Sequence, residues 1–251
     1  MIRLMLLAAA LAAPMPADEP RRFESRHIEE KLAGCDDAKN GCAHAEFTYV
    51  ELVTGPAQVQ DRINSAIRDY LLARPGDGLR LTPAEYARHF VADYQQLRSQ
   101  ETNFEQKWTL SKTVKELRSA APVISLECSE WSYMGGTHGM GATQYLNFDT
   151  LTGGPVKLDA VIRNGWLPRL TAIAEVQFRA ARELPATANL ADAGFTFPDG
   201  RFQLNRNFGI TNENLVFTYN PYEVAPYMMG PTTIEIPLAG IGDLLRPGFL
   251  R

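Results

Sequence analysis

The order of hydrophobic and polar positions predicts that the chain opens with one strand followed by two helices. Residues 44–55 alternate apolar and polar side chains, as a strand does, and the apolar residues of 57–73 recur at the spacings of three and four that indicate an amphipathic helix. A second helix is expected to begin after Thr82, because TPAE at 82–85 supplies a capping residue, a proline for the first turn and a glutamate that completes a capping box.

A period of two dominates the next part of the chain. Residues 104–118, 122–133 and 142–149 predict three successive antiparallel strands, and the polar side of the first predicts a sheet with one wet face and one face covered by helices. The remaining expected elements are a third helix near Leu167, a hairpin over 208–219 and a last strand through Ile234, Ile236 and Leu238. The pattern therefore predicts an α+β fold, with antiparallel sheets, helices packed on one face and two intimately associated subdomains.

The first residues predict a cleaved secretory signal over 1–17. One basic residue, Arg3, precedes an apolar run from Leu4 to Ala13, and small residues follow it. The run stops after about ten residues, which is short of the roughly 17 to 25 that a membrane-spanning helix needs. We therefore expect a mature chain without a membrane span, located in the periplasm or secreted.

Charge and cysteine content narrow the possible functions. Removal of 1–17 takes away Arg3 and no acid, which leaves 24 basic and 29 acidic side chains and argues against a nucleic-acid partner. Cys35 and Cys42 are separated by six residues of a polar, turn-rich segment, and an oxidising compartment would favour a disulfide between them. Cys128 alternates with polar neighbours and is expected to face the core.

The chemistry-bearing side chains show no metal-ligand spacing. The four histidines, His27, His44, His89 and His138, are scattered, and no pair of histidines or cysteines has the separation of a structural or catalytic metal site. We therefore predict no metal and no cofactor.

Two glycine-rich and aromatic stretches carry a family resemblance. WSYMGGTHGM, which begins at Trp131, resembles the Tyr-x-Gly-Gly-[Ala/Thr]-His-Gly signature of the bacterial family catalogued as domain of unknown function 3298. ITNENLVFTYNPYEVAPYMMG, at 210–230, resembles the second signature of that family. The resemblance implies a domain of this type over 118–245, and 24–117 is similar to the companion domain, number 4163, that precedes it.

The resemblance implies an exported module that works near the cell envelope. The family includes the extracytoplasmic region of an anti-sigma factor that binds lysozyme, and the region in front of the catalytic domain of a peptidoglycan deacetylase. This chain has neither the cytoplasmic segment of the first nor the catalytic motifs of the second. We therefore expect a non-enzymatic binding module that recognises an envelope protein, such as a lysozyme-like protein, or a cell-wall glycan such as a peptidoglycan fragment.

Two interpretations of the first stretch stay open. In the first, the protein is a cell-wall glycan hydrolase or deacetylase in which His138 is the general base and Glu130, Glu213 or Glu223 is the carboxylate that orients it. In the second, Gly135 and Gly136 permit positive φ angles in a strand connection, Gly139 and Gly141 permit a bulge or close backbone approach between adjacent strands, and the imidazole bonds a nearby carbonyl or carboxylate.

The second stretch is also open to two interpretations. Its tyrosines and methionines predict either a recognition surface or a buried corner at the sheet edge. Trp108, Trp131, Tyr133 and Tyr145 either share a sheet face with it or pack against helices. The candidate binding residues are Tyr133, Gly135, Gly136, His138, Asn220, Tyr222, Glu223 and Tyr227.

Overall fold

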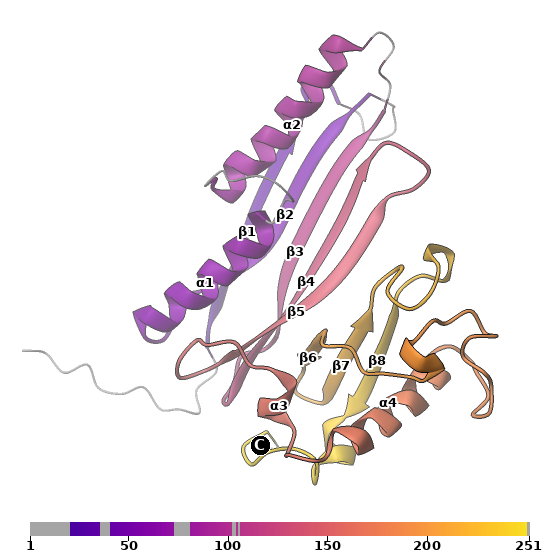
Figure 1. The fold of residues 1–251 in the computed structure, drawn as a ribbon. Helices are drawn as coiled ribbons and strands as arrows, with labels where there is room; N and C mark the ends of the chain where they lie inside the picture. The colour runs from indigo at the N-terminus through magenta and orange to yellow at the C-terminus, as the bar shows by residue number, and fades with distance from the viewer. Residues whose placement is uncertain (1–20, 36–40, 73–80, 102–103, 105, 250–251) are drawn as a thin grey trace, which may run out of the picture.

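The strands form two sheets, each with its own helical cover (Figure 1). The structure, a computed structural model, describes residues 21–35, 41–72, 81–101, 104 and 106–249. The predicted signal segment 1–17 lies outside the described residues. In the described part, a five-stranded sheet has the order β1-β2-β3-β4-β5 and a three-stranded sheet has the order β6-β7-β8. These elements confirm the predicted α+β class.

The five-stranded sheet takes its strands from the first 150 residues. Its strands are β1 (Phe23–Lys31), β2 (Ala43–Leu52), β3 (Trp108–Arg118), β4 (Val123–Met134) and β5 (Met140–Asp149). All neighbours are antiparallel except β2 and β3, which are parallel because two helices connect them. The boundary predicted at 117/118 falls within β3, one residue before that strand ends at Arg118, so the two predicted segments share this sheet.

Two helices cover one face of the five-stranded sheet. They are α1 (Ala57–Leu72) and α2 (Pro83–Gln100), and Figure 1 shows both on the same side of the sheet. The predicted capping box is present, because the Thr82 hydroxyl accepts a hydrogen bond from Glu85 N and the Glu85 carboxylate accepts one from Thr82 N. The core beneath the helices includes Phe47, Ile63 and Tyr94, each fully buried.

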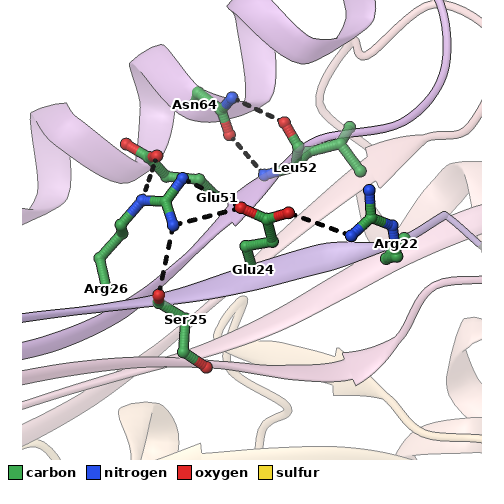
Figure 2. A network of polar contacts seen from close by, with 7 residues as sticks. All are labelled: Arg22, Glu24, Ser25, Arg26, Glu51, Leu52 and Asn64. Atoms are coloured by element: carbon green, nitrogen blue, oxygen red, sulfur yellow. Dashed lines mark hydrogen bonds and ion pairs between the residues drawn. The ribbon is translucent and has the colours of Figure 1, made fainter.

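Polar side chains fasten α1 to the end of β2 and line the edge strand β1 with charge (Figure 2). The Asn64 side chain of α1 accepts a hydrogen bond from Leu52 N at 2.8 Å and donates one to Leu52 O at 3.0 Å, which completes the backbone bonding where β2 ends. Arg26 of the edge strand β1 donates to Glu51 at 2.9 Å and to Glu24 at 3.3 Å. Charged side chains on an edge strand discourage pairing with a further chain.

The three-stranded sheet packs against the second group of helices. Its strands are β6 (Phe208–Ile210), β7 (Asn214–Tyr219) and β8 (Thr232–Pro237), and its helices are α3 (Leu158–Val161) and α4 (Leu167–Ala181). Phe178 of α4 is fully buried and contacts the rings of Phe195, Phe197, Phe202 and Tyr219. Short 3-10 turns occur at Pro198–Gly200, Tyr227–Met229 and Leu238–Ile241.

Buried polar groups join the two sheets. The Ser125 hydroxyl of β4 donates to Asn147 Oδ1 at 2.7 Å and accepts a hydrogen bond from Ile210 N at 2.9 Å, and Asn147 Nδ2 donates to Phe208 O at 2.7 Å. The backbone of Gly209 in β6 lies close to Tyr145 in β5: a Cβ added to Gly209 would be 2.6 Å from the tyrosine ring. Specific hydrogen bonds, as well as apolar packing, therefore position the second sheet against β4 and β5.

The predicted disulfide and the predicted burial of the third cysteine are both present in the structure. Cys35 and Cys42 form a disulfide between the end of β1 and the start of β2. Cys128 is fully buried on the helix-covered face. Within the described ranges, no helix combines the length and the apolar character that crossing a membrane requires.

Candidate functional site

The turn between β4 and β5 needs glycine at two positions. Gly135 has φ of 91° and Gly136 has φ of 100°, values that other residues rarely adopt. The Gln106 side chain also occupies the space that a Cβ at Gly135 would need. Tyr133 closes the turn by donating a hydrogen bond to Gly136 O at 3.0 Å. The positive φ angles predicted for both glycines are confirmed.

Trp131 explains the other two glycines of the first motif. Its indole lies across Gly139 and Gly141, and a Cβ at Gly139 would overlap the ring. A bulge or a close approach of backbone was predicted at these glycines, whereas the structure places an indole side chain against them. Trp131 keeps 46% of its surface exposed, so one face of the ring rests on backbone and the rest is open to solvent.

His138 lies at the tip of this turn and contacts the second motif. Its Nδ1 is 2.9 Å from Gly139 O, and because a carbonyl oxygen only accepts, Nδ1 carries a proton. In the neutral ring, Nε2 then accepts a hydrogen bond from the Tyr222 hydroxyl, 3.4 Å away. The imidazole also stacks on the Tyr227 ring, with centroids 3.7 Å apart and planes 15° from parallel. The bond to a carbonyl that the strand-connection interpretation predicted is confirmed.

Asn220 attaches the second motif to the free edge of β5. Its side chain accepts a hydrogen bond from Thr143 N at 2.7 Å and donates one to Thr143 O at 2.9 Å, as a neighbouring strand would. Glu223 accepts hydrogen bonds from Asn220 N at 2.9 Å and from Asn205 Nδ2 at 2.8 Å. Asn220 and Glu223 therefore hold the loop in place, and the Glu223 carboxylate is used within the loop.

Some residues of the second motif form a buried corner, and others form an exposed surface. Val224 is buried, while Tyr222 is 57% exposed and Met228 is 91% exposed. The Tyr227 ring is half-buried beneath His138, and its hydroxyl donates to Gly139 O at 2.8 Å. The segment is a packed corner on one side and an exposed surface on the other.

The sequence analysis missed the asparagine pair that supports this corner. Asn207 Nδ2 donates to Thr143 O at 2.7 Å, Asn207 Oδ1 accepts from Tyr145 N at 3.0 Å, and Asn205 donates to Thr218 O at 2.7 Å. An amide side chain carries a donor and an acceptor side by side, so it substitutes for a peptide group along a strand edge. The signal was the repeated asparagine in NRN at 205–207.

The aromatic residues divide between the two faces of the five-stranded sheet. Trp108 packs against Phe90 and Tyr94 of α2, so it belongs to the helix-covered face. Trp131, Tyr133 and Tyr145 lie on the opposite face, since side chains alternate along a strand. Packing against helices, the second interpretation of these four aromatic residues, therefore holds for Trp108, while the other three lie on the opposite face.

The free thiol among the described residues, that of Cys128, lies on the helix-covered face of the five-stranded sheet. Burial raises the pKa of the Cys128 thiol to about 12, so this thiol stays protonated near neutral pH. No group of three or more histidine, cysteine, aspartate and glutamate side chains in the described part could hold a metal ion. The eight candidate residues therefore form one exposed, hydrogen-bonded corner built from two loops, and its contacts are those of a structured surface.

The fold and this corner define an α+β protein in which a glycine turn and an aromatic loop from two sheets meet. Residues 159–239 match the family described as "Protein of unknown function (DUF3298)". This range contains the whole second motif, 210–230, and lies within the segment 118–245 predicted for such a domain. No protein of curated function matches the chain.

Solved structures show the same fold. A member of the DUF3298 family from Bacteroides fragilis NCTC 9343 is 22% identical, with a TM-score of 0.67 over 91% of this chain and 95% of that chain. A DUF3298 family protein from Pseudomonas aeruginosa PAO1 is 18% identical, with a TM-score of 0.62 over 92% of this chain and 97% of that chain. At these identities the likeness concerns the fold alone.

Proposed function

We propose that the protein is an exported, non-enzymatic binding module that recognises a lysozyme-like protein at the cell envelope through the corner formed by its two motifs. The observation that carries the proposal is where large apolar side chains are exposed. Of the eight such residues in the described part, five lie in or beside the two motifs: Trp131, Met134, Met140, Tyr222 and Met228.

The chemistry of these five residues favours a protein partner. Tryptophan, tyrosine and methionine are enriched at protein interfaces, and tryptophan and tyrosine most often dominate the binding energy. The His138 and Tyr227 stack and the Asn220 bonds hold the loop that carries Tyr222 and Met228, which lowers the entropy that binding at this loop would cost. The net formal charge of −4 suits a partner with a basic surface.

The cysteines support an exported protein. The disulfide between Cys35 and Cys42 is of the kind that persists in oxidising compartments such as the periplasm or the cell exterior. The segment 1–17, with its short apolar run, is interpreted as the export signal. We place the protein in the periplasm or outside the cell on these two observations.

The contacts of His138 support binding over hydrolysis of a cell-wall glycan. A general base in such an enzyme is oriented by a carboxylate or acts beside a nucleophile. The two ring nitrogens of His138 contact Gly139 O and the Tyr222 hydroxyl, and the Glu223 carboxylate bonds Asn220 and Asn205. These are the contacts of a side chain that shapes a loop.

The test is calorimetric titration of the purified protein with lysozyme. We expect binding that weakens at least tenfold in Trp131→Ala and in Met228→Ser, while Leu151→Ser, at an exposed position outside the motifs, binds as the wild type does. Wild-type protein that does not bind lysozyme, or equal weakening in all three variants, would overturn the proposal.

A parallel experiment separates the two glycan alternatives. The protein is incubated with purified peptidoglycan, the pellet is examined for bound protein, and the supernatant is examined by mass spectrometry. Retention in the pellet with no lysozyme binding would assign a peptidoglycan fragment as the ligand. A product that wild-type protein releases and His138→Ala does not would assign a hydrolase or deacetylase.

A further inference from the structure

A groove of about 760 Å³ runs along the seam between the two hydrophobic cores and borders the corner described above at Asn205. One wall is the edge of the five-stranded sheet at residues 145–148 of β5. The other walls are the segment 155–159, the first turn of α4 and the segment 203–208. Ligand sites favour such junctions, and this volume lies within the usual range for a small-molecule site.

The inside of the groove is apolar and belongs to both cores. Leu146 packs against the core of the first sheet, while Leu158 and Leu204 pack against the core of the second, and all three stay partly exposed within the groove. Leu167, which is 51% exposed, stands on the α4 side. The three residue steps from Tyr145 to Phe148 make this wall about 10 Å long. A groove of this length and lining suits an aliphatic chain of medium length.

Two cations face the groove from opposite walls. Lys157 lies on the segment beside α3, and Arg206 lies on the segment before β6; both are exposed. Within the described residues neither side chain makes an ion pair. Asp159 is the only acid among the lining residues of this described groove, so the charge around it is positive by one unit.

Hydrogen bonds to one buried residue fix the two segments that carry these cations. Asn147 O accepts a hydrogen bond from Val156 N at 2.8 Å, next to Lys157, and Asn147 Nδ2 donates to Phe208 O at 2.7 Å, two residues from Arg206. Arg206 also lies between Asn205 and Asn207, whose side chains attach this segment to β5 and β7. The backbone that carries each cation is thus fixed before any ligand arrives.

We propose that this groove binds a fatty carboxylate of medium chain length, with its chain against Leu146, Leu158 and Leu204 and its carboxylate paired with Lys157 and Arg206. The apolar seam accounts for the chain, and the positive charge accounts for the sign of the head group. Guanidinium and carboxylate form strong, charge-assisted hydrogen bonds, which gives Arg206 the larger part in recognising the head group.

The test is calorimetric titration of the whole protein with decanoate below its micelle concentration, compared with decyltrimethylammonium. We expect decanoate to bind and the cationic amphiphile to bind at least tenfold more weakly. The double variant Lys157→Gln/Arg206→Gln is expected to weaken decanoate binding about tenfold, and Asp159→Asn to tighten it about twofold to fivefold. Arg201→Gln, an exposed arginine outside the groove, is the matched control and should leave the affinity unchanged.

A second pair of variants tests the apolar wall. Leu167→Ser is expected to weaken decanoate binding about fivefold, whereas Val176→Ser, an exposed position of the same helix outside the groove, should not change it. Circular dichroism confirms that each variant folds. The proposal is overturned if decanoate does not bind, if the cationic amphiphile binds equally well, or if the charge variants leave the affinity unchanged or shift it with the opposite sign.

Discussion

The imidazole of His138 stacks on the phenol ring of Tyr227, with ring centroids 3.7 Å apart. The Tyr227 hydroxyl also donates a hydrogen bond to the carbonyl of Gly139, the residue after His138, although Gly139 and Tyr227 are 88 residues apart in the chain. This stack joins the glycine turn of the first sheet to the aromatic loop between β7 and β8 of the second sheet. His138 Nδ1 and the Tyr227 hydroxyl both donate a hydrogen bond to the carbonyl oxygen of Gly139, so this carbonyl fixes the position of the two rings relative to each other. The two sequence motifs therefore form one corner.

We predict that His138 and Tyr227 are energetically coupled. Stacked aromatic pairs contribute about 0.5–1.5 kcal/mol beyond the area they bury, so the variants His138→Ala and Tyr227→Leu should be non-additive by about that amount. The measurement is the free energy of unfolding in urea for both single variants and the double variant. The matched cycle replaces His138→Ala with His27→Ala on β1, for which we expect additivity; coupling of equal size in both cycles would contradict the assignment.

Asn64 is predicted to stabilise the junction of α1 and the first sheet. Asn64→Ala leaves Leu52 N and Leu52 O without their side-chain partner in a part-buried place, which should lower the free energy of unfolding by about 1–3 kcal/mol. Gln58→Ala, at an exposed position of the same helix, should change it by less than about 0.5 kcal/mol. Equal stability of the two variants would show that the paired bonds in Figure 2 contribute nothing.

Gly209 is predicted to be required where the two sheets meet. A Cβ at this position would lie 2.6 Å from Tyr145 Cδ1 and 3.0 Å from Leu117 Cδ1, and Tyr145 has little freedom to move because its hydroxyl bonds Thr218 at 2.9 Å. Gly209→Ala should therefore lower the free energy of unfolding by about 1–3 kcal/mol.

Gly240 supplies the control for this substitution. A Cβ there has open space around it, and Gly240→Ala should be close to neutral or stabilising. Thermal unfolding of the two variants measures the difference. A Gly209→Ala protein that unfolds at the wild-type temperature would show that the sheets can separate slightly at no cost.

Cys128 is predicted to be unreactive in the folded protein. Its side chain is fully buried, and burial raises the pKa of the thiol from an ordinary value of 9.0 to about 12. At pH 8 the native protein should not react with Ellman's reagent, while the unfolded protein should release one equivalent from this thiol. Cys128→Ala should release none in either state, and fast reaction of the native wild type would contradict the burial.

The same shift has a defined sign for stability. A thiol whose pKa is raised on folding favours the folded state while it stays protonated, so its contribution is complete below about pH 9. Between about pH 9 and pH 12 the unfolded chain loses the thiol proton first, and the contribution falls. Wild type should therefore lose more stability than Cys128→Ala over this range in urea titrations at several pH values.

Sequence patterns predicted those elements whose signal is local. The capping box at Thr82 and Glu85 marks where α2 begins, and the period of two in 122–133 and 142–149 marks β4 and β5, because these features depend on neighbours a few residues away. β1 was missed. Its sequence, FESRHIEEK, carries only two large apolar residues, since an edge strand with charged side chains needs little burial.

The candidate site illustrates what a linear pattern leaves out. The eight candidate residues were identified as two separate motifs, with the glycine requirement of the first predicted from residue type. Tertiary structure decided that His138 meets Tyr227, that Asn220 replaces a neighbouring strand beside Thr143, and that Glu223 bonds within its own loop. Asn220 and Thr143 lie 77 residues apart, so no periodicity connects them.

By itself, therefore, the sequence determined the class of fold, the pairing of Cys35 with Cys42, the burial of Cys128 and the conformation of Gly135 and Gly136. Each of these follows from residue type and local spacing. The parallel pairing of β2 with β3, the seam that holds Lys157 and Arg206, and the meeting of the two motifs were decided only in three dimensions. They depend on how two cores pack against each other, and that packing is set by contacts between residues distant in the chain.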